Sequence, residues 1–128
     1  MNYLIDTHVF LWLSLSPERL SEQACQILQN RENSIFLSKV SIWEIQIKQQ
    51  LGKVSLALPL ATLVADERQT NQLQLLSIET HHIYGLSALE QHHRDPFDRL
   101  IISQARQEEM TLVSADQIFS QYPVQLIW

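Results

Sequence analysis

Short apolar runs alternate along the chain with longer segments in which apolar residues recur every three or four positions. The short runs are typical of strands that are covered on both faces of a sheet. The spaced patterns are typical of helices that bury one side. Five runs are predicted as strands: Tyr3–Ile5, Ile35–Leu37, Leu75–Ile78, Thr111–Val113 and Gln125–Ile127.

Three helices are predicted between these strands from their spacing and their end signals. Ser16 as N-cap and Pro17 at the first helical position predict the start of the first, whose apolar residues continue through position 28. The second has apolar residues at helical spacing between positions 40 and 51, and Gly52 is a natural stop. The third begins at Pro96 and repeats the same apolar pattern.

Strands that alternate with helices indicate parallel βαβ units. The expected fold is therefore α/β: a three-layer α/β/α sandwich around a short, mostly parallel sheet of about five strands. No repeat, linker or low-complexity tract interrupts the pattern, so residues 1–128 are expected to form a single domain. In such sheets, ligand sites form beyond the carboxyl ends of the strands.

Composition narrows the possible classes of protein. The chain is 45% hydrophobic and 18% charged, with a formal net charge of −5, which is ordinary for a globular protein. An acidic balance argues against coating nucleic acid through bulk charge, but an enzyme can still hold phosphate through a bound cation. The single cysteine excludes a disulfide framework and a thiolate metal cluster. No signal peptide or membrane-spanning segment is predicted, so a cytoplasmic location is expected.

Two aspartates follow predicted strands directly. Asp6 comes after Tyr3–Ile5, and Asp116 lies just beyond Thr111–Val113, two residues after Ser114. Each has a local explanation, because an aspartate in this position can cap the helix that follows. Each also lies where the carboxyl end of a parallel sheet is expected.

Two further acids lie in predicted helices. Glu44 fits a capping box with Ser41 or an i,i+4 ion pair with Lys48, yet its neighbours are apolar and would bury it. Asp98 lies in the first helical turn after Asp95 and Pro96, where a negative charge suits the helix dipole. Asp95 is explained as the N-cap of this helix. Asp98 either stabilises the helix through its dipole or forms part of a functional site.

A parallel sheet would place the regions of Asp6, Glu44, Asp98 and Asp116 along one edge. Close carboxylates repel by about 4 kcal/mol per pair at an effective dielectric near 20, so such a cluster needs a cation or raised pKa values. Oxygen ligands alone favour Mg²⁺ or Mn²⁺ over zinc. A cation of this kind polarises a phosphoryl oxygen and activates water for in-line attack.

At these residues the sequence resembles the PIN-domain nucleases, and within them the VapC-like toxins of bacterial toxin–antitoxin pairs. The segments that carry the resemblance are "YLIDTHVFLW", "LSKVSIWEIQIK", "HRDPFDRLIISQA" and "TLVSADQIF", in the family's order and spanning residues 3 to 119. The resemblance implies a metal-dependent endoribonuclease that dimerises and is inhibited by an antitoxin protein.

Carried over by motif, the resemblance makes Asp6, Glu44, Asp98 and Asp116 the metal-binding, catalytic acids, with Ser114 assisting. His8 and the additional Asp95 depart from the commonest family pattern, and their contact with substrate stays open, as does the choice between one and two ions. Arg99, beside Asp98, is a candidate for a phosphate contact or an ion pair with a site acid. The sequence does not identify the RNA or the antitoxin.

Two other classes of protein that place acids at strand ends each need a residue that this chain lacks. A phospho-receiver needs paired acids after the first strand, and a haloacid-dehalogenase-type phosphatase needs an aspartate where His8 stands, so both fail. A catalytically silent PIN-like interaction module and a PIN-type nuclease that cuts DNA stay open. The adjacent pairs His81–His82 and His92–His93 are expected on solvated helix surface, with rings that diverge and cannot share an ion.

Overall fold

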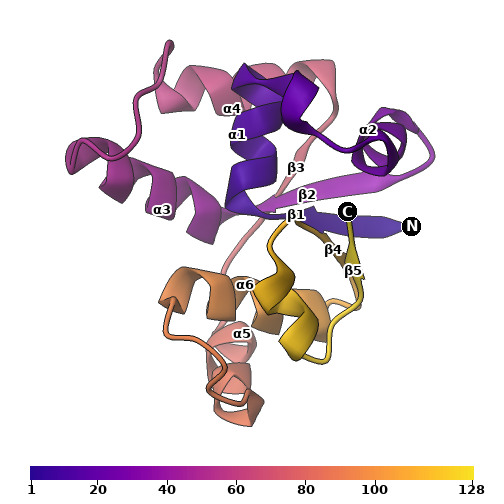
Figure 1. Cartoon of the computed structure of the whole chain (residues 1–128), viewed down its shortest axis with the longest axis vertical. Coiled ribbons are helices and arrows are strands. Elements are labelled where there is room, and N and C mark those ends of the chain that lie inside the picture. The colour runs from indigo at the N-terminus through magenta and orange to yellow at the C-terminus, as the bar shows by residue number, and fades with distance from the viewer.

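Five parallel strands form the centre of the computed structural model, which describes all residues from 1 to 128 (Figure 1). Every neighbouring pair of strands is parallel, and the spatial order is β3-β2-β1-β4-β5. The predicted α/β fold is confirmed, and the strand ends differ from prediction by at most two residues. The strands are β1 (Asn2–Ile5), β2 (Ser34–Ser38), β3 (Gln74–Leu76), β4 (Thr111–Val113) and β5 (Leu126–Ile127).

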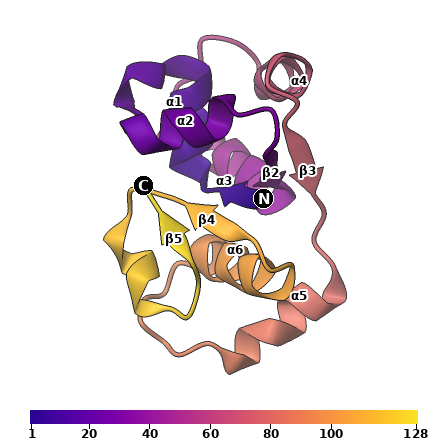
Figure 2. The same cartoon turned by 90° about the vertical axis from the view of Figure 1, so that its right-hand side faces the viewer.

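Helices cover both faces of this sheet, as the turned view in Figure 2 shows. The group α1, α2 and α4 covers one face, α5 and α6 cover the other, and α3 begins where β2 ends and contacts α6. Three short 3₁₀ helices complete the chain. The helices are α1 (Thr7–Leu15), η1 (Pro17–Arg19), α2 (Glu22–Gln29), α3 (Lys39–Gln50), α4 (Leu60–Thr70), α5 (Thr80–Tyr84), η2 (Gly85–Ala88), α6 (Pro96–Gln107) and η3 (Gln117–Gln121).

The sheet separates two hydrophobic cores. Successive side chains of a strand point to opposite faces, so Tyr3 and Ile5 of β1 enter the core under α1, α2 and α4, whereas Leu4 enters the core under α6. All three are buried. This burial on both faces explains why the strands read as continuous apolar runs.

The first predicted helix is interrupted in the structure. Ser16 makes no side-chain capping bond, and Pro17–Arg19 forms only the 3₁₀ turn η1. The α-helix starts again at Glu22, after Ser21, whose hydroxyl accepts from the Ala24 N–H at 3.0 Å. The prediction of one helix from Ser16 was therefore wrong, because the second serine offers the chain a better cap.

Two helices, α4 and α5, were not predicted. The start of α4 at Leu60 follows Pro59 and has no side-chain cap. The start of α5 depends on Glu79 and on the side chain of His82, which accepts from the Glu79 N–H at 3.0 Å. None of the helices is long and apolar enough to cross a membrane.

A buried polar contact ties α6 to the sheet. The Ser38 hydroxyl, at the end of β2, donates to Gln104 Oε1 at 2.5 Å, and both side chains are fully buried. The amide of Gln104 also donates to the carbonyl of Ser77, just beyond β3, at 3.3 Å. These contacts fix α6 against the carboxyl ends of two strands, which sets the position of its first turn.

Candidate active site

Four acidic residues gather beyond the carboxyl ends of the strands. Asp6 follows β1, Asp116 follows β4, Glu44 lies in the second turn of α3, and Asp98 lies in the first turn of α6. The helices α1, α3 and α6 all begin at this edge of the sheet (Figure 1). The topology therefore brings together acids that are up to 110 residues apart in the chain.

Asp6 and Asp116 are joined through Ser114. The Ser114 hydroxyl donates to Asp6 Oδ2 in a short hydrogen bond and accepts from the Asp116 N–H at 3.0 Å. Asp6 Oδ1 also caps α1, accepting from the Val9 N–H at 2.8 Å. Burial raises the pKa of Asp6, the charge of Asp116 adds to the rise, and the bonds from Ser114 and Val9 oppose it. Ser114 thus lies at the centre of this half of the cluster.

Glu44 is buried with both of its oxygens hydrogen-bonded. Oε1 accepts from the Thr7 hydroxyl at 2.7 Å, and Oε2 lies 2.6 Å from Lys48 Nζ. The Ser41 hydroxyl is 2.9 Å from that of Thr7. The i,i+4 pair with Lys48 is thus present, but the capping box with Ser41 is not, because Ser38 is the N-cap of α3.

Four other acidic side chains oppose the ionisation of Asp98. Its N–H donates to Asp95 Oδ1, the N-cap of α6, at 3.2 Å, and its Oδ2 lies 3.4 Å from His93 Nε2. Burial, followed by the charges of Asp95, Glu44, Asp6 and Asp116, raises the pKa of Asp98 to about 8. All three of the other candidate acids are therefore close enough to oppose its ionisation.

One lysine balances part of this negative charge. The hydrogen bond that Lys48 donates to Glu44 raises the pKa of Lys48, and the charges of Asp95 and Asp98 contribute to the rise. His93 contacts only Oδ2 of Asp98, and the Ile118 N–H donates only to Oδ1 of Asp116. Asp98 Oδ1 and Asp116 Oδ2 therefore have no hydrogen-bond partner. The cluster is built from oxygen donors with excess negative charge, which is the type of ligand that hard divalent cations prefer.

Arg99 and His8 lie differently from the four acids. Arg99 Nη2 donates to the carbonyl of Leu89 at 3.4 Å, its Nε is buried without a partner, and it forms no ion pair with a site acid. His8 is exposed, with its ring 6.1 Å from that of Trp12, and its charge lowers the pKa of Asp6 only as a minor contribution.

The expectation that the paired histidines lie on solvated surface was wrong for His82 and His93. His82 is fully buried, and its ring centroid is only 4.2 Å from that of His81, with both rings beside Glu108. The ligand atoms of these three residues lie within 4.8 Å of one another, so the expectation that the two rings diverge was wrong as well. Because His82 Nδ1 accepts from the Glu79 N–H, the proton of the neutral ring is on Nε2, which then donates to Glu108 Oε1 at 3.2 Å.

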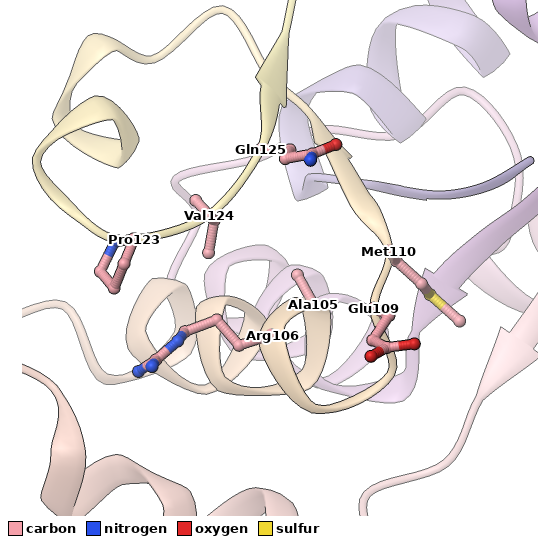
Figure 3. A pocket seen from close by; sticks show the side chains of 7 residues that line it. All are labelled: Ala105, Arg106, Glu109, Met110, Pro123, Val124 and Gln125. Carbon is pink, nitrogen blue, oxygen red and sulfur yellow. The ribbon is translucent and has the colours of Figure 1, made fainter.

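A separate hollow of about 360 Å³ opens at the opposite edge of the sheet (Figure 3). It is bounded by the last turn of α6, the turn before β4 and the segment that leads into β5. Arg106 and Glu109 provide its charged groups, and Met110 and Val124 provide apolar ones. The hollow lies at the amino ends of β4 and β5, so it is not part of the acid cluster.

Three residues around the acids were not recognised as parts of the site. Thr7 donates to Glu44, Lys48 neutralises it, and His93 approaches Asp98. The adjacency of Thr7 to Asp6 and the i,i+4 spacing of Lys48 were visible signals. The only signal for His93 was its position just before the acidic turn at Asp95, because its contact with Asp98 depends on the loop that precedes α6.

A sequence model of the PIN domain matches residues 3–125. A search of curated proteins found no match. Several solved structures share the fold. One is VapBC2 from Rickettsia felis, bound to a DNA fragment from its promoter, with TM-score 0.75, 18% identity, and 99% of this chain and 98% of that chain covered.

Two other solved structures are similar over nearly their full length. DNA-bound VapBC from Salmonella typhimurium has TM-score 0.68 and 14% identity, covering 99% of this chain and 97% of that one. FitAcB from Neisseria gonorrhoeae has TM-score 0.63 and 17% identity, covering 98% of this chain and 96% of that one. The structural matches agree in fold with the sequence match, and the chain belongs to the PIN-domain family.

Proposed function

We propose that this protein is a Mg²⁺- or Mn²⁺-dependent endoribonuclease of the toxin type. The observation that carries the proposal is the position of Asp98 among Asp6, Glu44 and Asp116, where its pKa rises to about 8. A carboxyl group whose pKa is raised this far is typical of a functional site. A carboxyl group without such a role would normally lie nearer to water, where its ionisation is easier. The PIN-domain family, whose members hydrolyse phosphodiester bonds, supplies the reaction class.

In this proposal Asp6, Asp98 and Asp116 hold the cation, and Glu44 completes the negative shell. The bound ion would supply Lewis acidity toward a phosphoryl oxygen and a lowered pKa for water. The Ser114 hydroxyl bridges Asp6 Oδ2 and the Asp116 N–H and so fixes these two residues relative to each other. Thr7 orients Glu44. Lys48 provides positive charge beside the acids, where a substrate phosphate would enter.

We further propose a protein antitoxin as partner and a homodimer as the working form. The similar structures include toxin–antitoxin complexes such as VapBC from Salmonella typhimurium. The chain also presents an apolar groove between α3 and α4, lined by Ile42, Leu60 and Val64 among others, which fits an apolar segment of such an antitoxin. Trp43, 57% exposed beside Phe97, is proposed for the dimer surface. Residues 1–128 are proposed to fold as one domain, with a single unfolding transition.

One observation favours a catalytically silent interaction module instead. Each of the four acids has a structural partner: Asp6 and Asp116 cap helices, Glu44 pairs with Lys48, and Asp98 lies at a helix start. A fold could keep such residues for stability. The Asp98 pKa argues against this, since a role in stability alone would favour a neutral residue at that position.

Cleavage assays separate these possibilities. Structured and single-stranded RNA would be incubated with the protein and Mg²⁺ or Mn²⁺, beside DNA of the same sequence, with EDTA as the metal-free control. We expect discrete RNA products that disappear in EDTA and in Asp98→Asn. The matched control is Asp66→Asn, which removes an exposed acid of α4 and should leave cleavage unchanged.

The other outcomes are equally informative. Cutting of the DNA alone would indicate the DNA-directed alternative. Equal cutting by Asp98→Asn would indicate a contaminating nuclease or a wrong site. No cutting, together with no change in thermal stability on adding Mn²⁺, would indicate the silent module, because a ligand of the folded state must stabilise it.

A further inference from the structure

The side chain of His93 is held by a buried tyrosine. Tyr122 is 4% exposed, and its phenol oxygen accepts from the His93 backbone N–H at 3.3 Å. The same oxygen lies 2.8 Å from His93 Nδ1. Tyr122 is thus in contact with both the backbone and the ring of one histidine.

These two contacts determine which ring nitrogen of His93 carries the proton. A phenol has one proton to donate, and of its two hydrogen-bond partners only His93 Nδ1 can accept, because the other is the His93 backbone N–H. If Nδ1 carried a proton instead, the buried phenol would accept twice and its own O–H would lack a partner, which is unfavourable for a buried polar group. Tyr122 therefore donates to Nδ1, and in the neutral ring the proton is on Nε2.

The protonated nitrogen faces the candidate site. His93 Nε2 lies 3.4 Å from Asp98 Oδ2, and the imidazole side chain is 18% exposed. Phe119 and Tyr122 pack against the ring, with centroids 6.5 Å and 5.5 Å away, and limit its rotation. Tyr122 O–H thus donates to His93 Nδ1, and His93 Nε2–H donates to Asp98 Oδ2.

We propose that His93, oriented by Tyr122, is a positioning residue for Asp98. Its Nε2–H binds Oδ2 and leaves Oδ1, which has no partner in the structure, directed to a divalent cation. This inference rests on the proposed function in assuming a cation at the acid cluster. His93 is not itself a ligand, because neither ring nitrogen has a free lone pair. Hydrogen-bonded partners of metal-ligating carboxylates commonly contribute about 10- to 100-fold to metal affinity.

The neighbouring histidine provides the matched control. His92 Nε2 lies 3.3 Å from Glu90, an 84% exposed acid outside the cluster, and its ring packs edge-on against Tyr122. Replacing His92 removes a similar side chain next to the same tyrosine without touching Asp98. A merely structural role of the histidine loop would make the two replacements alike.

The first experiment measures the tautomer of His93 by ¹⁵N NMR of the metal-free full chain at pH 8.5. We expect the Nε2–H form for His93 and a partial or complete loss of that preference in Tyr122→Phe. An Nδ1–H form in the wild-type protein would overturn the proposal. This measurement does not depend on metal binding or cleavage.

The second experiment measures Mn²⁺ affinity by calorimetry. His93→Leu should weaken binding by about 10- to 100-fold, whereas His93→Gln, whose amide can donate near the position of Nε2, should recover most of it. His92→Leu should bind as wild type, and thermal unfolding in EDTA would confirm that each variant is folded. Normal binding by His93→Leu would overturn this inference alone. A wild-type chain that binds no Mn²⁺ would overturn the proposed function, and with it the positioning role.

Discussion

Lys48 Nζ lies 2.6 Å from Glu44 Oε2, while the Thr7 hydroxyl holds the other oxygen of the same carboxylate. Glu44 therefore has no oxygen free of hydrogen bonds, although it is one of the acids proposed to surround a cation. The Lys48 side chain is 35% exposed and can withdraw into solvent. A divalent cation and the lysine ammonium thus compete for one carboxylate.

Lys48→Met should therefore raise the affinity for Mn²⁺. Removing a positive charge a few ångströms from the cation favours binding, by about tenfold after allowance for solvent screening. The same change should lower the stability of the metal-free protein by about 1 kcal/mol, because Glu44 is left buried without its partner. Calorimetric titration gives the first quantity and urea unfolding in EDTA the second.

Lys53→Met is the control for this comparison, since Lys53 is exposed beyond the end of α3. It should change neither quantity. Weaker Mn²⁺ binding by Lys48→Met would mean that the lysine supports the cation site instead of competing with it.

Asp98→Asn should stabilise the metal-free protein at alkaline pH. Because the pKa of Asp98 is about 8 in the folded state and near 4 in an unfolded chain, the folded state holds the extra proton between these values. Stability is therefore lost as pH rises from about 4 through 8, and the loss is complete above 8. We expect Asp98→Asn to be more stable than wild type by roughly 1–3 kcal/mol at pH 9, and similar near pH 4.

Chemical unfolding at several pH values in EDTA measures this difference. A variant that is less stable than wild type at every pH would show that Asp98 acts mainly in starting α6. Addition of Mn²⁺ should reverse the order at pH 9, since only the wild-type cluster keeps all four acids.

Cation binding should release a proton near neutral pH. A cation favours the ionised carboxylate, so Asp98, whose pKa is about 8, must lose its proton when Mn²⁺ binds at pH 7. Calorimetry in two buffers of different ionisation enthalpy should show release of about one proton at pH 7 and almost none at pH 9.5. Affinity should rise with pH up to about 8 and then level off. Affinity that is independent of pH from 6 to 8 would contradict the assignment of Asp98 to the cation.

Ser21 is expected to stabilise α2 as its N-cap. Ser21→Ala removes the bond to the Ala24 N–H and should lower the free energy of unfolding by about 1 kcal/mol. Ser16→Ala is the matched control, because Ser16 makes no side-chain capping bond, and it should change stability little. Urea denaturation of the wild type and the two variants measures these differences. A larger loss of stability in Ser16→Ala than in Ser21→Ala would instead support a helix that starts at Pro17.

The parts of the fold that could be predicted depend on neighbours in the chain. Asp95 and Pro96 identified the start of α6 because an N-cap and the proline after it act within one helical turn. The strands were visible because burial on both faces leaves a continuous apolar run. Ser16 and Ser21 show the limit, because both resemble an N-cap and only the packing of the finished fold selects the second.

The surroundings of the acids could be predicted only in part, because their partners are distant in sequence. Glu44 and Lys48 are one helical turn apart, and that contact followed from spacing. The contact of Glu44 with Thr7 spans 37 positions and that of Asp6 with Ser114 spans 108. Contacts of this kind depend on the order of the strands in the sheet. The alternation of strands and helices predicts the fold class but not that order.

The distance along the chain between Asp6 and Ser114 also has a consequence for synthesis. A ribosome makes Asp6 among the first residues, yet the hydroxyl that holds this carboxylate belongs to the segment directly after β4. Until β4 has been made and has paired with β1, the cluster lacks both Ser114 and Asp116. A growing chain with the proposed activity would thus be harmless to the RNA around it for most of its synthesis, and a partner protein made at the same time could be present before the first competent site forms.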